Sequence, residues 1–158
     1  MVVDIEIAEA FGIAGLFLCM AMSATGTAIG MMKAARAGVG VLSEEPRYFS
    51  SVLLLTFLPA TQLLVYGSGF TLLVAGAFPE DLNLSQGVGL FALSAFVGVA
   101  QLFSAYGQGT VCADTIVMLP KTRGAALVRG LVLVAYLEFV GLLGLVFGYM
   151  FLSYALGG

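Results

Sequence analysis

The chain contains long apolar runs separated by short segments that carry nearly all of its charged residues. Three runs hold no charged residue and a fourth holds one, Glu138; the runs are Phe11–Met32, Tyr48–Pro79, Leu82–Ala113 and Gly130–Gly158. A helix needs about 20 apolar residues to cross a hydrocarbon core of about 30 Å, so each run is long enough for one crossing and too short for two. In lipid a helix satisfies its backbone hydrogen bonds within the segment. The pattern therefore predicts an all-α membrane protein with four transmembrane helices.

The composition supports the same conclusion. Of 158 residues, 61% are hydrophobic and 9% are charged, whereas a soluble domain carries about 25% charged residues. A soluble fold of this size could not hide so much apolar surface from water, so the lipid bilayer is the expected environment. The chain supplies a few spans and no sizeable domain outside the membrane, and we expect no nucleic-acid partner.

The positions of the charges predict how the helices are oriented. All six basic residues fall into two clusters: Lys33, Arg36 and Arg47, and Lys121, Arg123 and Arg129. Acidic residues mark the N-terminus and the middle connection: Asp4, Glu6, Glu9, Glu80 and Asp81. Cytoplasmic loops are enriched in Lys and Arg, so we expect the basic loops Lys33–Arg47 and Lys121–Arg129 in the cytoplasm and both termini outside. No positive charge precedes the first run, so we expect that helix to be retained rather than removed as a signal peptide.

An internal repeat divides the chain into halves. Ser23-Ala-Thr-Gly-Thr27 recurs as Ser104-Ala-Tyr-Gly-Gln108. Each copy is expected near the cytoplasmic end of a span and is followed by a basic loop and another apolar helix. The sequence therefore predicts two tandem helical hairpins, residues 1–80 and 81–158, with the ionisable glutamate in the second.

Glycine is concentrated in the first and third spans. The first has Gly12, Gly15, Gly26 and Gly30, and the third has Gly87, Gly89, Gly98, Gly107 and Gly109. Small residues let helix backbones approach closely in lipid, where packing drives association. We therefore expect these two spans to pack tightly in an inner layer, with the other two facing outward.

Glu138 is the candidate functional residue. It lies nine residues past Arg129, about 14 Å along a helix, which is near the middle of the bilayer. An ionised carboxylate at that depth is costly, and such residues mark ion or proton pathways. No Lys or Arg of this chain is expected to reach it. The charge must be compensated by a proton, a metal ion or a group on another subunit.

Other polar groups are predicted at the same depth. Leu58, Thr61 and Gln62 share one face of the second span, and Pro59 removes a backbone hydrogen bond there, which makes nearby carbonyls available. Gln108 on the third span offers another amide oxygen. Oxygen ligands suit a hard cation, whereas a proton would need only the carboxylate and one acceptor. The extra oxygens indicate Na⁺; in the alternative the ion is H⁺ alone, and the Gln and Thr side chains join helices by hydrogen bonds.

Several motifs give the chain a resemblance to a known family: Leu58-Pro-Ala-Thr-Gln62, Phe103-Ser-Ala-Tyr-Gly-Gln108-Gly and Tyr136-Leu-Glu138. Over nearly its whole length the chain resembles the proteolipid subunit K of prokaryotic V-type ATPases, a duplicated c-type subunit of a membrane rotor ring. The resemblance implies that Na⁺ is held by the carboxylate of Glu138. It also implies four further oxygen ligands: the side chains of Gln62, Gln108 and Thr61 and the carbonyl of Leu58.

One feature departs from the family pattern. The family tyrosine that hydrogen-bonds the carboxylate and locks the site usually follows the threonine by four residues. Here that position is Val65 and the tyrosine is Tyr66. A shift of one residue turns a side chain by about 100° on an α-helix. Either the kink absorbs the shift or the lock differs.

The resemblance also implies the partners. Identical copies form a closed ring, a stator membrane protein supplies an arginine that displaces the ion, and the protein of the central stalk touches the cytoplasmic loops. ATP hydrolysis or synthesis takes place in soluble subunits. The chain has no Gly-rich phosphate loop with a Lys and no nucleophile–base pair, so we expect no catalytic site in it. A prokaryotic plasma membrane is the expected location.

Two other classes of membrane protein remain as alternatives. A small proton-coupled exporter also has four helices and one membrane glutamate, but it usually carries that acid on its first helix and lacks a duplication. A structural proteolipid would have no transport cycle and would gain nothing from a polar cluster around Glu138. Both alternatives are disfavoured by the position of Glu138 or by its polar surroundings.

Overall fold

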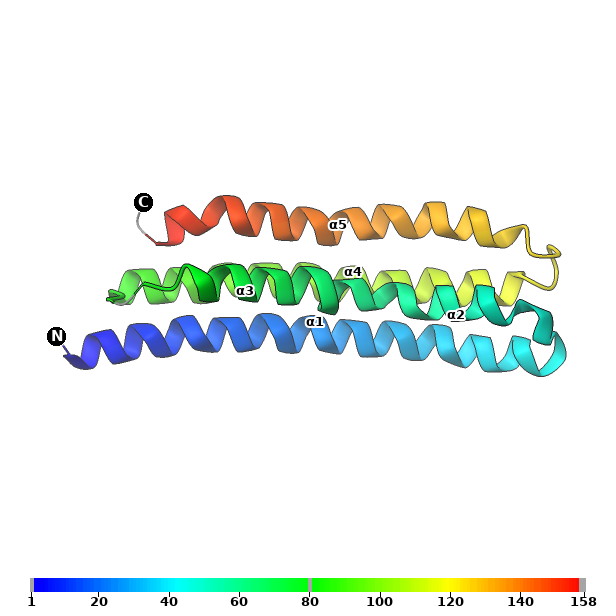
Figure 1. The fold of residues 1–158 in the computed structure, drawn as a ribbon, viewed down its shortest axis with the longest axis horizontal. Helices are drawn as coiled ribbons and strands as arrows, with labels where there is room; N and C mark the ends of the chain where they lie inside the picture. The colour runs from blue at the N-terminus through cyan, green and yellow to red at the C-terminus, as the bar shows by residue number, and fades with distance from the viewer. Residues whose placement is uncertain (1, 80, 157–158) are drawn as a thin grey trace.

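Four long helical rods make up most of the described part of the chain. They lie side by side, with both termini at the same end (Figure 1). The computed structural model describes residues 2–79 and 81–156, and side chains from residue 5 onward within them. Glu80 of the predicted acidic connection lies outside the described residues. The continuous rods are α1 (Val2–Glu44), α4 (Leu84–Met118) and α5 (Ala126–Ala155). Together with an interrupted rod at Pro46–Gly76, these described helices are long and apolar enough to span a membrane, which confirms the predicted fold class.

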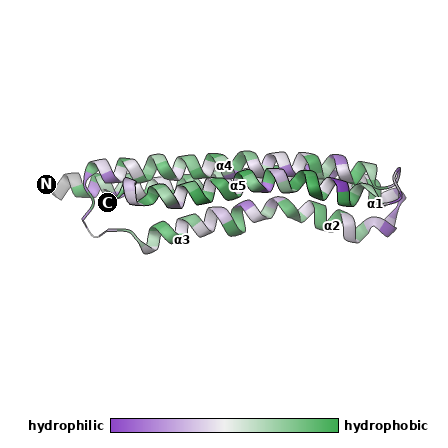
Figure 2. Cartoon of the chain, turned by 90° about the horizontal axis from the view of Figure 1, so that it is seen from above, coloured by the Kyte–Doolittle hydropathy of each residue, from purple (hydrophilic) through white to green (hydrophobic). Residues whose placement is uncertain are grey.

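The second rod changes its helical type several times. A 3₁₀ turn at Pro46–Tyr48 leads into α2 (Phe49–Phe57), and α3 (Ser68–Gly76) ends the rod. Between them lie a 3₁₀ turn at Leu58–Ala60 and a π-helix at Gln62–Gly67. Pro59 causes the 3₁₀ turn at Leu58–Ala60, because proline lacks a backbone donor and its ring obstructs the α-helical turn before it. Figure 2 shows α2 and α3 as a bent rod beside the straighter α4 and α5.

The first helix is longer than expected, which corrects the predicted basic loop. Lys33 and Arg36 lie within α1, and Arg129 lies within α5. The segment after Lys33 is rich in Ala and other residues compatible with a helix, and the helix ends before Pro46, with Glu45 extended at φ −133° and ψ 73°. The 43 residues of α1 measure about 65 Å, roughly twice the thickness of a hydrocarbon core. Part of α1 therefore extends beyond the bilayer.

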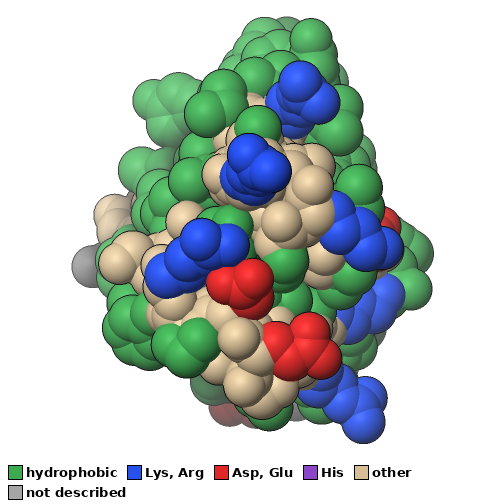
Figure 3. Space-filling view, turned by 90° about the vertical axis from the view of Figure 1, so that its right-hand side faces the viewer, with side chains coloured by type: hydrophobic (Ala, Val, Ile, Leu, Met, Phe, Trp, Pro, Cys, Tyr) green, Lys and Arg blue, Asp and Glu red, His purple; other side chains and the backbone are tan. Residues whose placement is uncertain are grey.

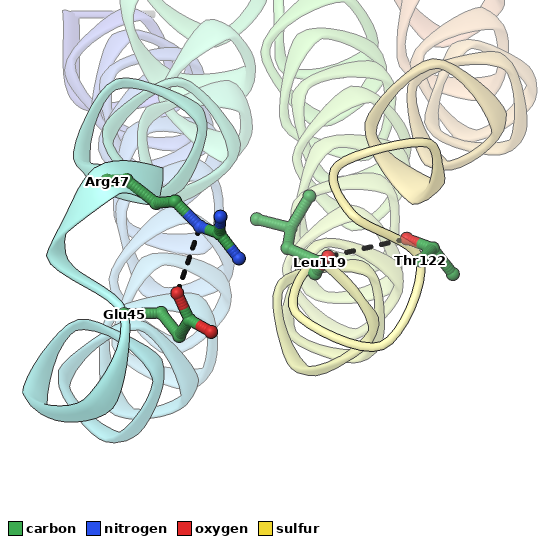
Figure 4. A network of polar contacts seen from close by, with 4 residues as sticks. All are labelled: Glu45, Arg47, Leu119 and Thr122. Carbon is green, nitrogen blue, oxygen red and sulfur yellow. Dashed lines mark hydrogen bonds and ion pairs between the residues drawn. The ribbon is translucent and has the colours of Figure 1, made fainter.

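The connection between α4 and α5 is a compact turn at the end of the bundle where α1 leads into α2 (Figure 1). Arg123 and Gly124 have positive φ angles of 51° and 91°, the left-handed region that glycine adopts at little cost. The N–H of Gly124 donates to the carbonyl of Leu119 at 2.9 Å. The Thr122 hydroxyl lies 3.5 Å from the same carbonyl (Figure 4) and accepts from the N–H of Ala126 at 3.0 Å. These bonds satisfy backbone groups that the helix ends leave free.

Basic side chains gather at this end of the bundle. Figure 3 looks onto it and shows several Lys and Arg side chains beside a few acidic ones. Glu45 and Arg47 form an exposed ion pair at 2.9 Å (Figure 4). An ion pair in water contributes little to stability, so this end is held together by its turns and by apolar packing.

Helices α1 and α4 pack against each other along most of their length, as the glycine pattern predicted. A Cβ on Gly26 would lie 2.5 Å from the carbonyl oxygen of Leu102, and one on Gly15 would lie 2.7 Å from the Cα of Phe91. Both contacts are closer than real Cβ atoms come, so the backbones can approach this closely only where a side chain is absent. This confirms the tight packing of the first and third spans.

The interior has an apolar cluster towards each end and a polar layer between them. The apolar cluster near the basic end includes Ala34, Leu55, Cys112, Ile116 and Leu119. The cluster towards the termini includes Ala8, Cys19, Phe70, Leu90 and Val97. Between them along the helices lie buried polar residues: Ser23, Thr27, Gln62, Gln101, Ser104 and Gln108. The two copies of the sequence repeat thus contribute to this polar layer from within α1 and α4.

Candidate ion-binding site

The carboxylate of Glu138 receives hydrogen bonds from two other spans. The hydroxyl of Tyr66 donates to Oε1 at 2.8 Å. Two amides donate to Oε2: Nε2 of Gln108 at 2.5 Å and Nε2 of Gln62 at 3.2 Å. Hydrogen bonds to an ionised group are stronger than bonds between neutral groups. Glu138 is only half-buried, whereas Gln62 and Gln108 are fully buried, so the cluster reaches from the interior of the bundle to its edge.

A group of oxygens surrounds the hydroxyl of Thr61. Its Oγ1 lies 3.1 Å from Oε2 of Glu138, 2.7 Å from Oε1 of Gln62 and 3.0 Å from the carbonyl oxygen of Leu58. A hydroxyl has one hydrogen and can donate it to only one of these acceptors at a time. Oxygens of four residues, Leu58, Thr61, Gln62 and Glu138, thus lie close together, and oxygen-rich surroundings of this kind suit a hard cation.

The structure brings together all the residues that the sequence indicated for this site. They come from three spans and lie in or beside the polar layer: Leu58, Thr61, Gln62, Tyr66, Gln108 and Glu138. No Lys or Arg among residues 5–79 and 81–156 forms an ion pair with Glu138. The charge of its carboxylate is therefore not compensated by a basic side chain of the described part of this chain.

The π-helix explains how Tyr66 reaches the carboxylate. The N–H of Ser68 bonds to the carbonyl of Leu63, five residues back, as in a π-helix. A residue five positions after Thr61 therefore occupies the place that a residue four positions on would take in an α-helix. The sequence left two alternatives open, a helix distortion that absorbs the shift and a different lock. The structure has the first, because the π-helix absorbs the extra residue.

Behind Gln62 lie residues that the sequence did not identify as part of the site. Ser104 accepts from Nε2 of Gln62 at 2.7 Å and donates to the carbonyl of Leu137 at 2.6 Å. Gln101 donates to the carbonyl of Gly141 at 2.9 Å. A signal was present, because residues 101, 104 and 108 are spaced by three and four and so share one face of a helix.

The first helix supports the bend in the second span. The hydroxyl of Thr27 donates to the carbonyl of Pro59 at 3.0 Å. The change from 3₁₀ to π geometry disturbs the regular ladder of backbone bonds here, and a buried carbonyl without a partner is costly. The repeat copy in α1 thus supports the site indirectly, whereas the copy in α4 contributes Gln108 directly and Ser104 as a partner of Gln62.

Gln108 can serve either state of the carboxylate. Its Nε2 donates to Glu138, while its Oε1 is buried and finds no hydrogen-bond partner in the described part of the chain. A rotation of the amide exchanges a donor for an acceptor at the same place. Gln108 can therefore stabilise a bare carboxylate with its NH₂ group or offer an oxygen to a cation held beside the carboxylate.

Comparison with known proteins adds an independent observation. The family model for the C subunit of ATP synthase matches residues 14–74 and again residues 87–151. Each match lies within one of the two helical hairpins. A comparison with curated proteins found no match. The two family matches cover most of the chain.

Proposed function

Because the chain belongs to the family of ATP synthase C subunits, we propose that it is the ring proteolipid of a V-type ATPase and that it carries Na⁺ across the membrane on Glu138. Members of this family are non-catalytic membrane subunits that assemble into the rotor rings of ATP synthases and ATPases. Family membership therefore argues against the small exporter and the structural proteolipid. The type of rotary enzyme and the identity of the ion are the parts proposed here.

Duplication supports the V-type assignment. The chain holds two family units in four spans, but at the depth of the site only the second unit has a carboxylate, Glu138. Gln62 stands at the equivalent depth in the first unit and donates to that carboxylate. Each protomer would then carry one ion for every four helices, as the resemblance to subunit K implies.

The observation that carries the Na⁺ proposal is the oxygen cluster around Thr61. A carboxylate oxygen, an amide oxygen and a backbone carbonyl oxygen all lie within 3.1 Å of its hydroxyl oxygen. A proton needs a single acceptor besides the carboxylate. A desolvated Na⁺ needs several oxygens to replace its water, and this cluster offers them from two spans.

The proposed cycle follows from the cost of charge in lipid. With Na⁺ bound, Glu138 is neutralised and the ring can turn the site past the lipid. At the stator, an arginine of another protein displaces the ion, which leaves through an access channel. A bare carboxylate cannot enter lipid cheaply, so ion movement and rotation are coupled. Hydrolysis or synthesis of ATP belongs to soluble subunits.

The charges support an orientation for the chain in the plasma membrane. The end of the bundle that carries the basic side chains (Figure 3) is assigned to the cytoplasm by the enrichment of Lys and Arg in cytoplasmic loops. Both termini lie at the opposite end and would face outside. The protein of the central stalk would then touch the turns at Pro46–Tyr48 and at residues 119–125.

Chemical labelling of the carboxyl tests the proposal. Dicyclohexylcarbodiimide reacts with protonated carboxyl groups, so bound Na⁺ should slow its reaction with Glu138 in native membranes across a range of pH. K⁺ at the same concentration is the control for ionic strength, and E138Q is the control for other sites of reaction. Slowing by Na⁺ alone supports the Na⁺ site. Dependence on pH alone makes the ion a proton, and no labelling at all contradicts the rotor assignment.

A further inference from the structure

We propose that Gln101 is a positioning residue for the ion site, because it fixes the amide of Gln62 with its oxygen towards the cation. This inference rests on the proposed Na⁺ site and extends it to a residue behind the ligands. Gln101 does not contact Glu138 in the structure. It would act on the ion through Gln62.

Gln101 is a fully buried amide in the polar layer. Its Nε2 is fixed by a hydrogen bond of 2.9 Å to the carbonyl of Gly141 on α5. Its Oε1 is buried and makes no hydrogen bond to any of the residues that the structure describes. A buried acceptor without a partner costs free energy, so this oxygen needs a donor that it can reach.

A candidate donor is the amide of Gln62, because both atoms lie close to the same point beside Gly141. A Cβ built on Gly141 would lie 2.9 Å from Oε1 of Gln101, 2.9 Å from Nε2 of Gln62 and 3.1 Å from Oγ of Ser104. Three polar atoms from two other spans thus converge on one point beside α5. Only a glycine leaves room for this convergence, because a methyl group would displace the polar atoms.

The convergence gives the amide of Gln62 a preferred direction. Behind it lie two acceptors, Oγ of Ser104, which already receives a hydrogen bond from Nε2 at 2.7 Å, and the free Oε1 of Gln101. An NH₂ group can donate to both, whereas an amide oxygen turned that way would face two acceptors. The amide of Gln62 is therefore held with its NH₂ group towards Ser104 and Gln101 and its Oε1 towards Thr61.

Ion binding changes which acceptor the second hydrogen of Gln62 uses. Without a cation, Nε2 of Gln62 also donates to Oε2 of Glu138 at 3.2 Å. A cation beside that oxygen repels the NH₂ group and competes for the carboxylate. The hydrogen is then released, and Oε1 of Gln101 accepts it. Gln101 thereby lowers the cost of replacing a hydrogen bond by an ion, and it favours Na⁺ over the bare carboxylate.

Two substitutions test this role of Gln101, one at Gln101 itself and one at Gly141, which faces it. Q101M keeps the length of the side chain and removes both polar atoms. G141A keeps Gln101 but adds a methyl group where the three polar atoms converge. We call the Na⁺ concentration that halves the labelling rate of Glu138 the half-effect concentration. In each variant it should rise about tenfold, the effect of one lost hydrogen bond near a charge.

Matched controls separate this role from simple packing. S94A removes another buried hydroxyl of α4 that has no partner among the described residues. G148A adds a methyl group on the same side of α5, against the apolar side chains of Val97 and Phe70. Both controls can weaken the ring, but the half-effect concentration of Na⁺ in the rings that assemble should stay at the wild-type value.

The outcomes are distinct from those that test the Na⁺ site itself. If Na⁺ does not slow labelling of the wild type, the proposed Na⁺ function is wrong, and the role of Gln101 is wrong with it. If Na⁺ protects the wild type, and the variants that assemble show the same half-effect concentration, then Gln101 is a packing residue and only this inference is overturned. If Q101M does not assemble, Q101L gives the result, because a methyl group at Gly141 also meets Nε2 of Gln62 directly.

Discussion

Tyr66 on the second span donates a hydrogen bond of 2.8 Å to Oε1 of Glu138 on the fourth span. This bond engages the carboxylate oxygen that the amides of Gln62 and Gln108 do not contact, since both donate to Oε2. Oε1 of Glu138 therefore accepts a hydrogen bond from Tyr66, and Oε2 faces the oxygen cluster around Thr61. This division allows a cation to bind at Oε2 while Oε1 stays fixed.

The first prediction concerns this hydrogen bond. In Y66F the ring remains but the donor to Oε1 is lost, so the carboxylate becomes more mobile. We expect the half-effect concentration of Na⁺ in labelling experiments to rise about threefold to tenfold, the range for one hydrogen bond. Y136F is the matched control, because Tyr136 lies two residues before Glu138 and is 70% exposed. Equal values for wild type and Y66F would show that the tyrosine does not hold the site closed.

The second prediction concerns the π-helix at Gln62–Gly67. Deletion of Leu64, whose side chain is 60% exposed, should convert this segment to an α-helix while the residues after it keep their orientation. We therefore expect the rings to assemble and the half-effect concentration of Na⁺ to change by no more than about twofold, because the tyrosine returns to the position of an ordinary α-helical neighbour of Thr61.

Deletion of Leu54 is the control for that experiment. Leu54 is also an exposed leucine, but it lies in the regular helix α2. There a deletion rotates Val52 and Leu55 relative to each other by about 100°, although both are buried in the core. We expect this variant to lose thermal stability or to fail to form rings. Comparable damage from both deletions would mean that the π-helix absorbs no extra residue.

The sequence predicted the spans and the grouping of their polar residues for identifiable physical reasons. Charged residues are so rare in lipid that their absence defines the spans, and the polar residues that remain inside must find one another. That argument led to Thr61, Gln62, Gln108 and Glu138 together, and the structure brings their side chains within hydrogen-bonding distance. It could not give the length of α1, because a helix can continue past Lys33 into water without any change in its pattern.

The local geometry of the second span was beyond sequence reasoning for a different reason. Pro59 indicates a distortion but not which backbone bonds replace the missing one. Whether Tyr66 faces the site depends on a shift of one residue that only the π-helix resolves. Gln101 was missed because an amide two turns from Gln108 looks like any buried polar residue until its neighbours are known. Its meaning depends on Gly141, which lies 40 residues further along the chain.

The third prediction concerns the contact between α1 and α4. In G26A the added methyl group meets the backbone of Leu102, whose carbonyl oxygen would be 2.5 Å away. Backbone atoms cannot move aside as a flexible side chain can, so we expect a loss of about 1–3 kcal/mol of packing free energy per protomer, the usual cost of overpacking. The temperature at which detergent-solubilised rings dissociate should fall.

Gly40 provides the control for helix propensity. It lies on the same helix, α1, but a Cβ there would meet nothing within 4 Å. Because Ala favours a helix over Gly by about 1 kcal/mol, G40A should leave the dissociation temperature unchanged or raise it. A fall of similar size in both variants would trace the effect to α1 itself and not to its contact with α4.

The last prediction separates the two ions. T61V replaces the hydroxyl by a methyl group of similar size, which removes the oxygen that lies within 3.1 Å of both Glu138 and Leu58. A Na⁺ site loses a ligand and gains an apolar group beside the ion. We expect the half-effect concentration of Na⁺ to rise by about tenfold to a hundredfold, as for a lost bond to a charged group.

A proton site would respond differently to the same change. Protonation of Glu138 needs none of the oxygens around Thr61, so T61V would leave the labelling rate of a proton-carrying ring nearly unaltered at each pH. T61S keeps the hydroxyl and should retain most of the Na⁺ protection. A ring in which T61V and T61S behave alike, and in which Na⁺ protects neither variant nor the wild type, would carry protons. The hydroxyl of Thr61 would then be a helix-packing group that donates to the carbonyl of Leu58.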